Sequence, residues 1–201
     1  ARELFFLCQP IAEIADVGPQ AEAIYRAIVS VLDAEGGSFE SVVSETVFLR
    51  SLRTNLEPVR LARDRVLETC AGGSHRPAMA EIEQFPLNER ACLEVAVQAV
   101  LPNTAPLRVD SFKATTACGC SECARLHGLR FHLGDEARLY ASGLCGQGND
   151  AYEQTQGMFN VAEGLLQQAG MEFSDVVRTW IHLREMERDY GDLNRARRDF
   201  F

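Results

Sequence analysis

The sequence predicts an α+β fold built from two tandem units, each with its helices packed on one face of a mixed β-sheet. The first observation behind this prediction is an internal repeat, in which a constant offset of 134 residues aligns residues 40–50 with residues 174–184. The alignment extends on both sides without a gap, which is typical of a duplicated structural unit. Its identical pairs include Gln20 and Gln154, Leu32 and Leu166, Gly36 and Gly170, Phe39 and Phe173, Val42 and Val176, Val43 and Val177, Leu49 and Leu183, Arg50 and Arg184, Ala62 and Ala196, and Arg63 and Arg197.

The second observation is that short apolar runs alternate with segments of helical periodicity, a pattern typical of mixed α and β structure. Residues 3–8 form an apolar run that predicts a buried strand, and Pro19 suits the first turn of the helix that follows. The helical spacing stops at Gly36, which predicts the end of that helix. The other elements predicted for the first unit are a strand at 40–50, a helix with Val59, Ala62 and Val66 on its buried face, and strands at 77–84 and 91–100.

The second unit follows a proline-containing linker at residues 101–106, a composition that interrupts regular structure. We therefore divide the chain into units at 1–102 and 103–201, the second of which lacks a counterpart of residues 68–102. Its predicted elements are a strand at 110–118, a hairpin at 129–145 turning at Gly134 and Asp135, a helix capped by Asn149 or Asp150, a strand at 174–184 and a helix with Leu193, Ala196 and Phe200 on its buried face.

The third observation is composition, which bounds both the fold and the function. With 46% hydrophobic residues among 201, the chain can bury a sizeable core. The net charge of −9 disfavours a nucleic-acid surface, which needs concentrated basic residues to neutralise phosphates. No apolar run reaches the length of a membrane span, no basic and apolar leader opens the chain, and seven irregularly spaced cysteines suit a reducing compartment. We expect a cytoplasmic protein that binds neither nucleic acid nor membrane.

The order of these elements, the Ser142-Gly143 pair near the end of a strand and the Val-Val start of residues 42–49 resemble the RidA/YjgF family, which is also labelled the L-PSP endoribonuclease family. The resemblance implies RidA-like (chorismate-mutase-like) units that associate through their sheets into a trimer or pseudo-trimer, with ligand sites in clefts between units. Residues 176–183 and 190–201 are similar to a tandem branch of that family, which contains chorismatases and proteins labelled pteridine-dependent deoxygenase-like.

The resemblance to RidA-type deaminases implies an arginine that holds the carboxylate of the substrate in two parallel hydrogen bonds. The nearest match is Arg76, which precedes Pro77 although the family order is Pro-x-Arg, so Arg76 is either this anchor or an ordinary solvated arginine. Glu94 matches the first glutamate of the family's last-strand pattern, and Ala96 replaces the second. These residues predict a site for a small carboxylate-bearing metabolite, with Arg76 catalytic and Glu94 binding substrate.

The predicted strand at 174–184 carries a second candidate site. Alternation on a strand places Arg178, Trp180 and His182 on one face, and Val177 with its alternate neighbours on the face toward the helices. Arg178 is predicted to bind a carboxylate and His182 to move a proton near neutral pH. The alternative is that all three pack in an interface between sheets, with the arginine stacked on the indole.

The cysteines of the second unit suggest two further roles. Cys118, Cys120 and Cys123 fall within six residues and could hold zinc with Cys145 or His127 as a fourth ligand, although a redox disulfide or plain reduced thiols also fit. Cys145 is predicted to bind substrate, because the glycines of its loop let the backbone approach a small ligand, the role that the resemblance assigns to this loop.

The leading functional hypothesis is a cofactor-independent hydrolase of the imine or enamine deaminase type, which forms a homo-oligomer. One alternative is a chorismatase-like hydrolase whose site comes mainly from the second unit. Another is a small-ligand-binding or assembly module without catalysis, which the displaced Arg76 and the lost second glutamate favour. The endoribonuclease label is disfavoured by the charge balance, and zinc at the cysteine cluster is the one cofactor considered.

Overall fold

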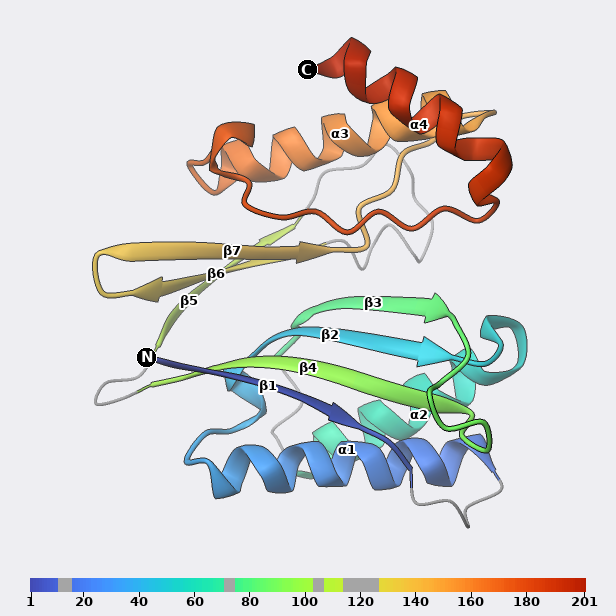
Figure 1. The fold of residues 1–201 in the computed structure, drawn as a ribbon. Coiled ribbons are helices and arrows are strands. Elements are labelled where there is room, and N and C mark those ends of the chain that lie inside the picture. The colour runs from blue at the N-terminus through green and yellow to red at the C-terminus, as the bar shows by residue number, and fades with distance from the viewer. Residues whose placement is uncertain (11–15, 71–74, 103–106, 114–126) are drawn as a thin grey trace. The chain divides into compact units, whose positions relative to one another are not determined.

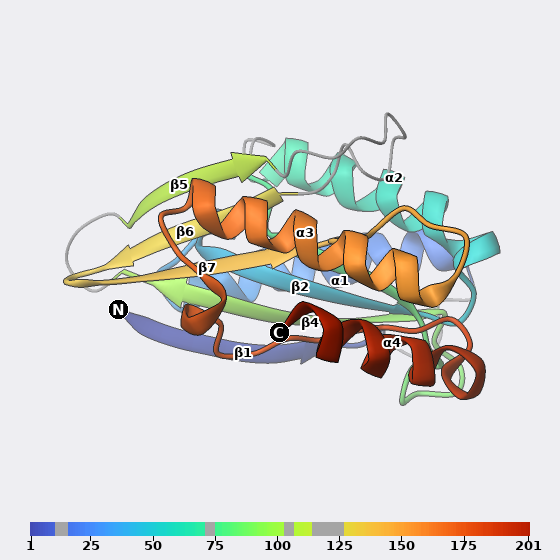
Figure 2. The same cartoon turned by 90° about the horizontal axis from the view of Figure 1, so that it is seen from above.

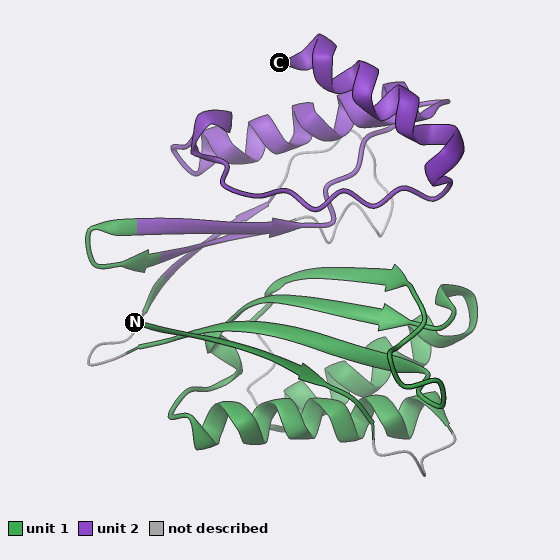
Figure 3. Ribbon diagram, in the orientation of Figure 1, with its two compact units in different colours: residues 1–108, 132–136 green, residues 109–131, 137–201 purple. Residues whose placement is uncertain are grey.

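The computed structural model describes residues 1–10, 16–70, 75–102, 107–113 and 127–201 (Figure 1). The chain divides into two compact units, coloured separately in Figure 3. The first comprises residues 1–108 with 132–136, and the second comprises residues 109–131 with 137–201. Each unit has its own sheet and its own pair of helices.

The sheet of the first unit has four strands in the order β1-β4-β2-β3. Their bounds are Arg2–Cys8 for β1, Leu93–Leu101 for β4, Val42–Leu49 for β2 and Ala78–Glu83 for β3. β4 pairs antiparallel with both β1 and β2, whereas β2 and β3 are parallel, so the sheet is mixed as predicted. In the middle of the central strands β4 and β2, buried residues alternate with less buried ones, as expected for a sheet that helices cover on one face.

Two helices, α1 (Val17–Ala34) and α2 (Leu52–Cys70), cover one face of this sheet (Figure 1). Both helices are amphipathic, and their apolar sides meet alternate residues of the strands to form the core. Fully buried core members include Ile24 and Ile28 from α1, Val66 from α2, Leu49 from β2 and Leu93 from β4. The opposite side of the sheet is called the helix-free face below.

A buried ion pair lies inside this core. Arg63 on α2 donates to the Glu45 carboxylate on β2, and the two side chains are 5% and 0% exposed. The guanidinium also lies 5.7 Å from the ring centroid of Tyr25 and 5.5 Å from that of Phe39. Burial, the largest single influence, lowers the pKa of Arg63, but the charge and hydrogen bond of Glu45 together with Tyr25 and Asp64 outweigh it, so the pKa is raised and Arg63 stays charged.

Most of the second sheet belongs to the second unit, and its strands are β5 (Arg108–Lys113), β6 (His127–Leu133) and β7 (Glu136–Ser142) in that order. The helices of the second unit are α3 (Ala151–Gln168) and α4 (Met186–Phe200). Figure 2 shows α3 running along β6 and β7. The packing is close, because a Cβ on Gly128 of β6 would lie 3.2 Å from Leu165 of α3. Arg130 of β6 reinforces it by donating to the carbonyl of Ala169 at the end of α3.

The bounds of the elements repeat at the offset found in the sequence. β1 corresponds to β7, α1 to α3 and the start of α2 to the start of α4, each displaced by 134 residues. A short 3₁₀ turn at Phe39–Ser41 likewise recurs at Phe173–Asp175. Gly36 and Gly170 end their helices with φ of 78° and 69°, a left-handed conformation that glycine adopts without strain. The predicted turn at Gly134 and Asp135 is also present between β6 and β7.

The prediction of a strand at residues 174–184 is wrong. After the 3₁₀ turn, residues 176–183 run without strand pairing, and Val177, predicted to face the helices, is 99% exposed. In the first unit the equivalent strand β2 lies between β4 and β3. Among the described residues of the second unit no strand stands in either place, so the segment has no ladder to join. The strand predicted to extend to residue 145 also stops earlier, at Ser142.

No helix in the described ranges is long and apolar enough to cross a membrane.

Candidate functional site

The predicted substrate residue Glu94 lies on the helix-free face of the first unit's sheet. Val95 and Val97 pack in the core with the helices, so alternation along β4 places Glu94 and Ala96 on the opposite face. Strand pairing sets Glu94 beside Phe48 of β2, and Phe48 beside Ile82 of β3. These three residues form one row across the sheet, close to the loop that joins β3 to β4.

Glu94 is only 4% exposed, which is unusual for a carboxylate. Its Oε2 accepts hydrogen bonds from Nε2 of Gln9 at 3.0 Å and from the backbone N–H of Leu87 at 3.1 Å. In the described part of the chain Oε1 has no donor, and no cationic side chain pairs with the carboxylate. The two N–H donors offset part of the cost of burying the charge, and one oxygen remains for another donor.

Arg50, which follows β2, lies at the same end of the sheet and was missed by the sequence reasoning. Its Nε and Nη2 both lie 3.1 Å from the carbonyl oxygen of Ala91, and Nη2 also donates to the carbonyl of Glu89. The guanidinium carbon lies 5.1 Å from the ring centroid of Phe85. Within the described ranges Arg50 has no carboxylate partner, and Nη1 has no acceptor. The repeat was the available signal, since it pairs Arg50 with Arg184.

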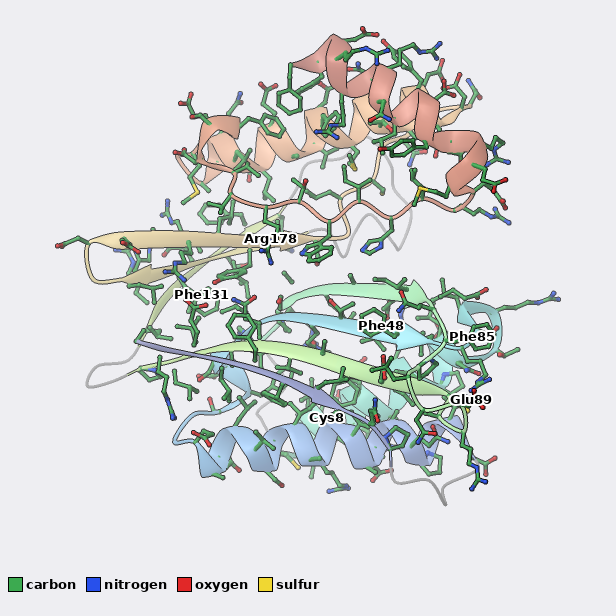
Figure 4. All side chains as sticks on the ribbon, in the orientation of Figure 1. Cys8, Phe48, Phe85, Glu89, Phe131 and Arg178 are labelled. Carbon is green, nitrogen blue, oxygen red and sulfur yellow. The ribbon has the colours of Figure 1, made fainter. Side chains whose placement is uncertain are left out.

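The loop of residues 84–92, called the β3–β4 loop below, links these two charged side chains. Its Leu87 N–H donates to Glu94, and its carbonyl groups at Glu89 and Ala91 accept from Arg50. Figure 4 shows Phe48, Phe85 and Glu89 at this one end of the sheet. The Phe85 side chain is 68% exposed, so an apolar surface lies beside the fixed cation. Through these hydrogen bonds the loop fixes the positions of the Glu94 carboxylate and the Arg50 guanidinium.

Arg76, the predicted carboxylate anchor, is not close to Glu94. It is exposed, precedes β3, and donates through Nη1 to the carbonyl of His75 at 3.1 Å. The row that contains Glu94 crosses β3 at Ile82, six residues further on, which corresponds to about 20 Å along an extended chain. The Pro-x-Arg position itself is Met79, which packs against the apolar core. A small ligand therefore cannot contact both Arg76 and Glu94.

Among the side chains of the first unit whose pKa is altered, His75 and Cys8 are both shifted mainly by burial. His75 lies 2.7 Å from the carbonyl oxygen of Val42 and meets Phe39 edge-on, and burial lowers the pKa of its imidazole. Burial raises the pKa of the Cys8 thiol at the end of β1. A raised thiol pKa disfavours the reactive thiolate, so Cys8 is not an activated nucleophile.

The predicted residues of the second unit lie on exposed chain. Arg178, Trp180 and His182 all belong to the unpaired segment at 176–183, and Trp180 is 77% exposed. The guanidinium carbon of Arg178 lies 5.7 Å from the ring centroid of Trp180, which is the stacking that the interface alternative predicts. Their predicted placement on one strand face does not occur, because the segment is not a strand.

The cysteine predictions divide between described and undescribed parts of the chain. Cys145 is exposed in the segment between β7 and α3. Cys118, Cys120 and Cys123 lie outside the described residues, so zinc binding there stays a prediction.

No protein-family model and no curated protein matches this sequence. Solved structures do match. Rv2704 of Mycobacterium tuberculosis, a member of the YjgF/YER057c/UK114 family, shares 15% identity over 48% of this chain and 79% of its own, with a TM-score of 0.40. TdcF of E. coli with bound serine shares 19% identity over 50% and 81%, with a TM-score of 0.43. The YjgF gene product of E. coli shares 20% identity over 48% and 80%, with a TM-score of 0.41.

Proposed function

We propose that this protein is a RidA-type, cofactor-independent hydrolase of imines or enamines derived from amino acids, with its site at the Glu94 end of the first unit's sheet. In this reaction the oxygen of water bonds to the imine carbon, the C–N bond breaks, and nitrogen leaves as ammonia. The product of a 2-imino acid is then the corresponding 2-oxo acid. The resemblance of the sequence to the RidA family motivates the choice of this reaction.

The observation that carries the proposal is the state of the Glu94 carboxylate. It is 4% exposed, its Oε2 is held by Gln9 and Leu87, and no cation neutralises it within the described ranges. A carboxylate oxygen in this state can accept a proton from the attacking water or a hydrogen bond from the imine nitrogen. Its fixed position would lower the cost of orienting the reactants. Ala96 stands at the second glutamate position of the family pattern, so this role falls to Glu94.

A ligand-binding module without catalysis is the second candidate. It is favoured by the distance between Arg76 and Glu94, since the anchor implied by the family pattern is absent from the row that contains Glu94. A chorismatase-like activity would instead use Arg178 and His182 of the second unit. The next experiment distinguishes all three candidates.

The test is a proton NMR time course with two substrates offered separately, a 2-imino acid generated in place by an amino-acid oxidase and chorismate. We expect the protein to speed conversion of the imino acid to the 2-oxo acid above the protein-free rate. Glu94→Gln should reduce this acceleration by about 100-fold or more, a usual effect of removing a general base. Glu89→Gln is the matched control, because Glu89 is exposed on the same loop.

Each other outcome changes the assignment. If the Glu94→Gln variant keeps the full rate, Glu94 is not the reacting carboxylate. Consumption of chorismate alone would support the chorismatase-like alternative and move mutagenesis to Arg178 and His182. If neither substrate is consumed faster, both hydrolase candidates are excluded, and titration with amino acids tests the binding module.

A further inference from the structure

The buried cluster of Tyr25, Glu45 and Arg63 in the first unit contains three polar atoms that make no hydrogen bond to a described residue. These atoms are the Tyr25 hydroxyl oxygen, Oε1 of Glu45 and Nε of Arg63. Arg63, the most exposed of the three residues, is only 4% exposed, so bulk solvent does not reach these atoms. Buried polar atoms nearly always have a partner, because leaving one unpaired costs free energy. The described side chains do not supply that partner.

A second arginine of α2 shows how a complete ion pair is built in this chain. Nε of Arg60 donates to Oε1 of Glu81 at 2.7 Å, and its Nη2 donates to Oε2, which gives two parallel hydrogen bonds. Arg63 makes only the second of these contacts, from Nη2 to Oε2 of Glu45. Nε shares a carbon with Nη2, and Oε1 shares a carbon with Oε2, so the two unbonded atoms remain close neighbours.

The Tyr25 hydroxyl belongs to the same polar cluster. The guanidinium carbon of Arg63 lies 5.7 Å from the centroid of the Tyr25 ring. Burial, followed by the charge of Glu45, raises the pKa of Tyr25 well above its ordinary value of about 10, and the opposing effect of Arg63 is smaller. The hydroxyl therefore keeps its proton and can both donate and accept a hydrogen bond.

We propose that one internal water molecule binds between Tyr25, Glu45 and Arg63 and completes the hydrogen bonding of this cluster. The water accepts from the Nε–H of Arg63, donates to Oε1 of Glu45, and forms its third hydrogen bond with the Tyr25 hydroxyl. A cation at this site would be repelled by Arg63 and an anion by Glu45, whereas water is neutral and both donates and accepts. Internal waters typically make about three hydrogen bonds to buried polar groups, which is the number available here.

The proposed water site belongs to the first unit alone. The counterparts of its residues in the repeat are Phe159, Thr179 and Arg197, which supply neither a hydroxyl on an aromatic ring nor a carboxylate. Thr179 and Arg197 are also exposed, so solvent reaches them directly. The site is independent of the proposed hydrolase site, because Glu45 is paired with Val97 of the core and faces the helices.

A competing arrangement is a dry cluster, in which the Tyr25 hydroxyl donates directly to Oε1 of Glu45. The two arrangements differ in what lies beside the Nε–H of Arg63. In the proposed arrangement it is a water whose protons give a nuclear Overhauser effect (NOE) at this N–H. In the dry cluster no water is close enough to do so.

The experiment records water-selective NOE and rotating-frame NOE spectra of the ¹³C,¹⁵N-labelled full chain and reads them at the arginine Nε–H signals. Through-bond correlation with the side-chain carbons assigns each signal. We expect a water cross-peak at the Nε–H of Arg63 with opposite signs in the two spectra, which distinguishes a bound water from proton exchange. Arg60 is the internal control, since its Nε–H is bonded to Glu81 and should give no such cross-peak.

Tyr25→Phe tests whether the signal comes from water or is relayed by the exchanging proton of the Tyr25 hydroxyl. The cross-peak at Arg63 should persist in this variant, because the Nε–H and Oε1 of Glu45 still hold the water. Backbone amide shifts of α1 and β2 show whether the variant is folded. Tyr152→Phe is the matched control, which removes a hydroxyl bonded to Asp199 in the second unit and should leave the cross-peak unchanged.

Absence of the cross-peak in the unaltered protein would overturn the proposal, and so would its loss in folded Tyr25→Phe. If that variant does not fold, a high-resolution crystal structure of the unaltered protein decides. Density for a water within about 3.2 Å of both Nε of Arg63 and Oε1 of Glu45 supports the site. A direct hydrogen bond from Tyr25 to Glu45, with no water between the three groups, excludes it.

Discussion

The clearest comparison in this molecule is between β2 and residues 176–183, the equivalent segments of the two units. Both begin with two valines and end with leucine. Val43 in β2 is 0% exposed, whereas Val177, its counterpart, is 99% exposed. One segment is a central strand, and the other is extended chain without strand pairing. Similar local sequence has therefore produced opposite environments.

The difference shows that a strand depends on its neighbours more than on its own residues. β2 shares hydrogen bonds with β4 on one edge and with β3 on the other, and its alternate side chains meet two helices. The described part of the second unit supplies no strand beside 176–183. Because β propensity mainly reflects packing against neighbouring strands, an apolar segment alone does not become a strand.

The residues of the buried ion pair also differ in burial between the two units. Glu45 and Arg63 are buried together in the first unit, while their counterparts Thr179 and Arg197 are both exposed. The counterpart of Tyr25, which lies against Arg63, is Phe159, which has no hydroxyl group. The first unit therefore contains a polar cluster that the second unit does not share.

The largest expected effect comes from placing a charge at the two equivalent valines. Val43→Asp should destabilise the first unit by about 4 kcal/mol or more, because an unpaired carboxylate would be buried in its core. Val177→Asp should change stability by less than about 0.5 kcal/mol, as exposed substitutions usually do. Hydrogen exchange of α1 and β2 peptides measures the first unit, and hydrogen exchange of α3 and α4 peptides measures the second.

A large loss of stability in Val177→Asp would contradict the comparison. It would show that residues 176–183 are buried by a strand or partner in solution.

A medium effect is expected at the start of the equivalent helices α1 and α3. Oδ1 of Asp150 accepts from the N–H of Glu153 at 2.8 Å, whereas the counterpart Asp16 makes no capping hydrogen bond with its side chain. Asp150→Ala should cost about 1 kcal/mol, and Asp16→Ala only about 0.3 kcal/mol from its interaction with the helix dipole. Exchange rates of the first-turn amides in each helix measure the difference, and equal losses would contradict the capping assignment.

The smallest expected effect is a dependence on pH that is specific to the first unit. Burial lowers the pKa of His75 below its ordinary value of about 6.5, so the unfolded chain binds the proton first as the pH falls. Stability contributed by neutral His75 is therefore present above pH 6.5 and lost as the pH drops toward the folded-state pKa. Urea midpoints of the first unit between pH 7.5 and 5.5 measure this decline.

His182, in residues 176–183, provides the control for the pH dependence assigned to His75. His75→Gln should remove this part of the decline, whereas His182→Gln should keep it, since His182 is exposed in the other unit. A decline that is identical in both variants would show that His75 is not its source.

The sequence by itself determined the features that depend on local interactions. The repeat predicted the common spacing of β1 and α1 with β7 and α3, and Gly36 predicted the end of its helix. Helix bounds could be predicted because their hydrogen bonds, caps and terminal glycines all lie within a few residues of one another. Glu94 was found instead from its resemblance to the last-strand pattern of the RidA family, and its role stays a prediction.

Only the tertiary structure decided the features that depend on contacts between distant residues. The register of β2, β3 and β4 separates Arg76 from Glu94 and places Met79 in the core. The β3–β4 loop brings Arg50 to the carbonyl groups of Glu89 and Ala91, which no local pattern indicated. Residues 176–183 match the strand pattern but have no paired neighbour among the described residues. Strand pairing and loop contacts join residues far apart in the chain, so their outcome depends on the whole unit and not on the segment.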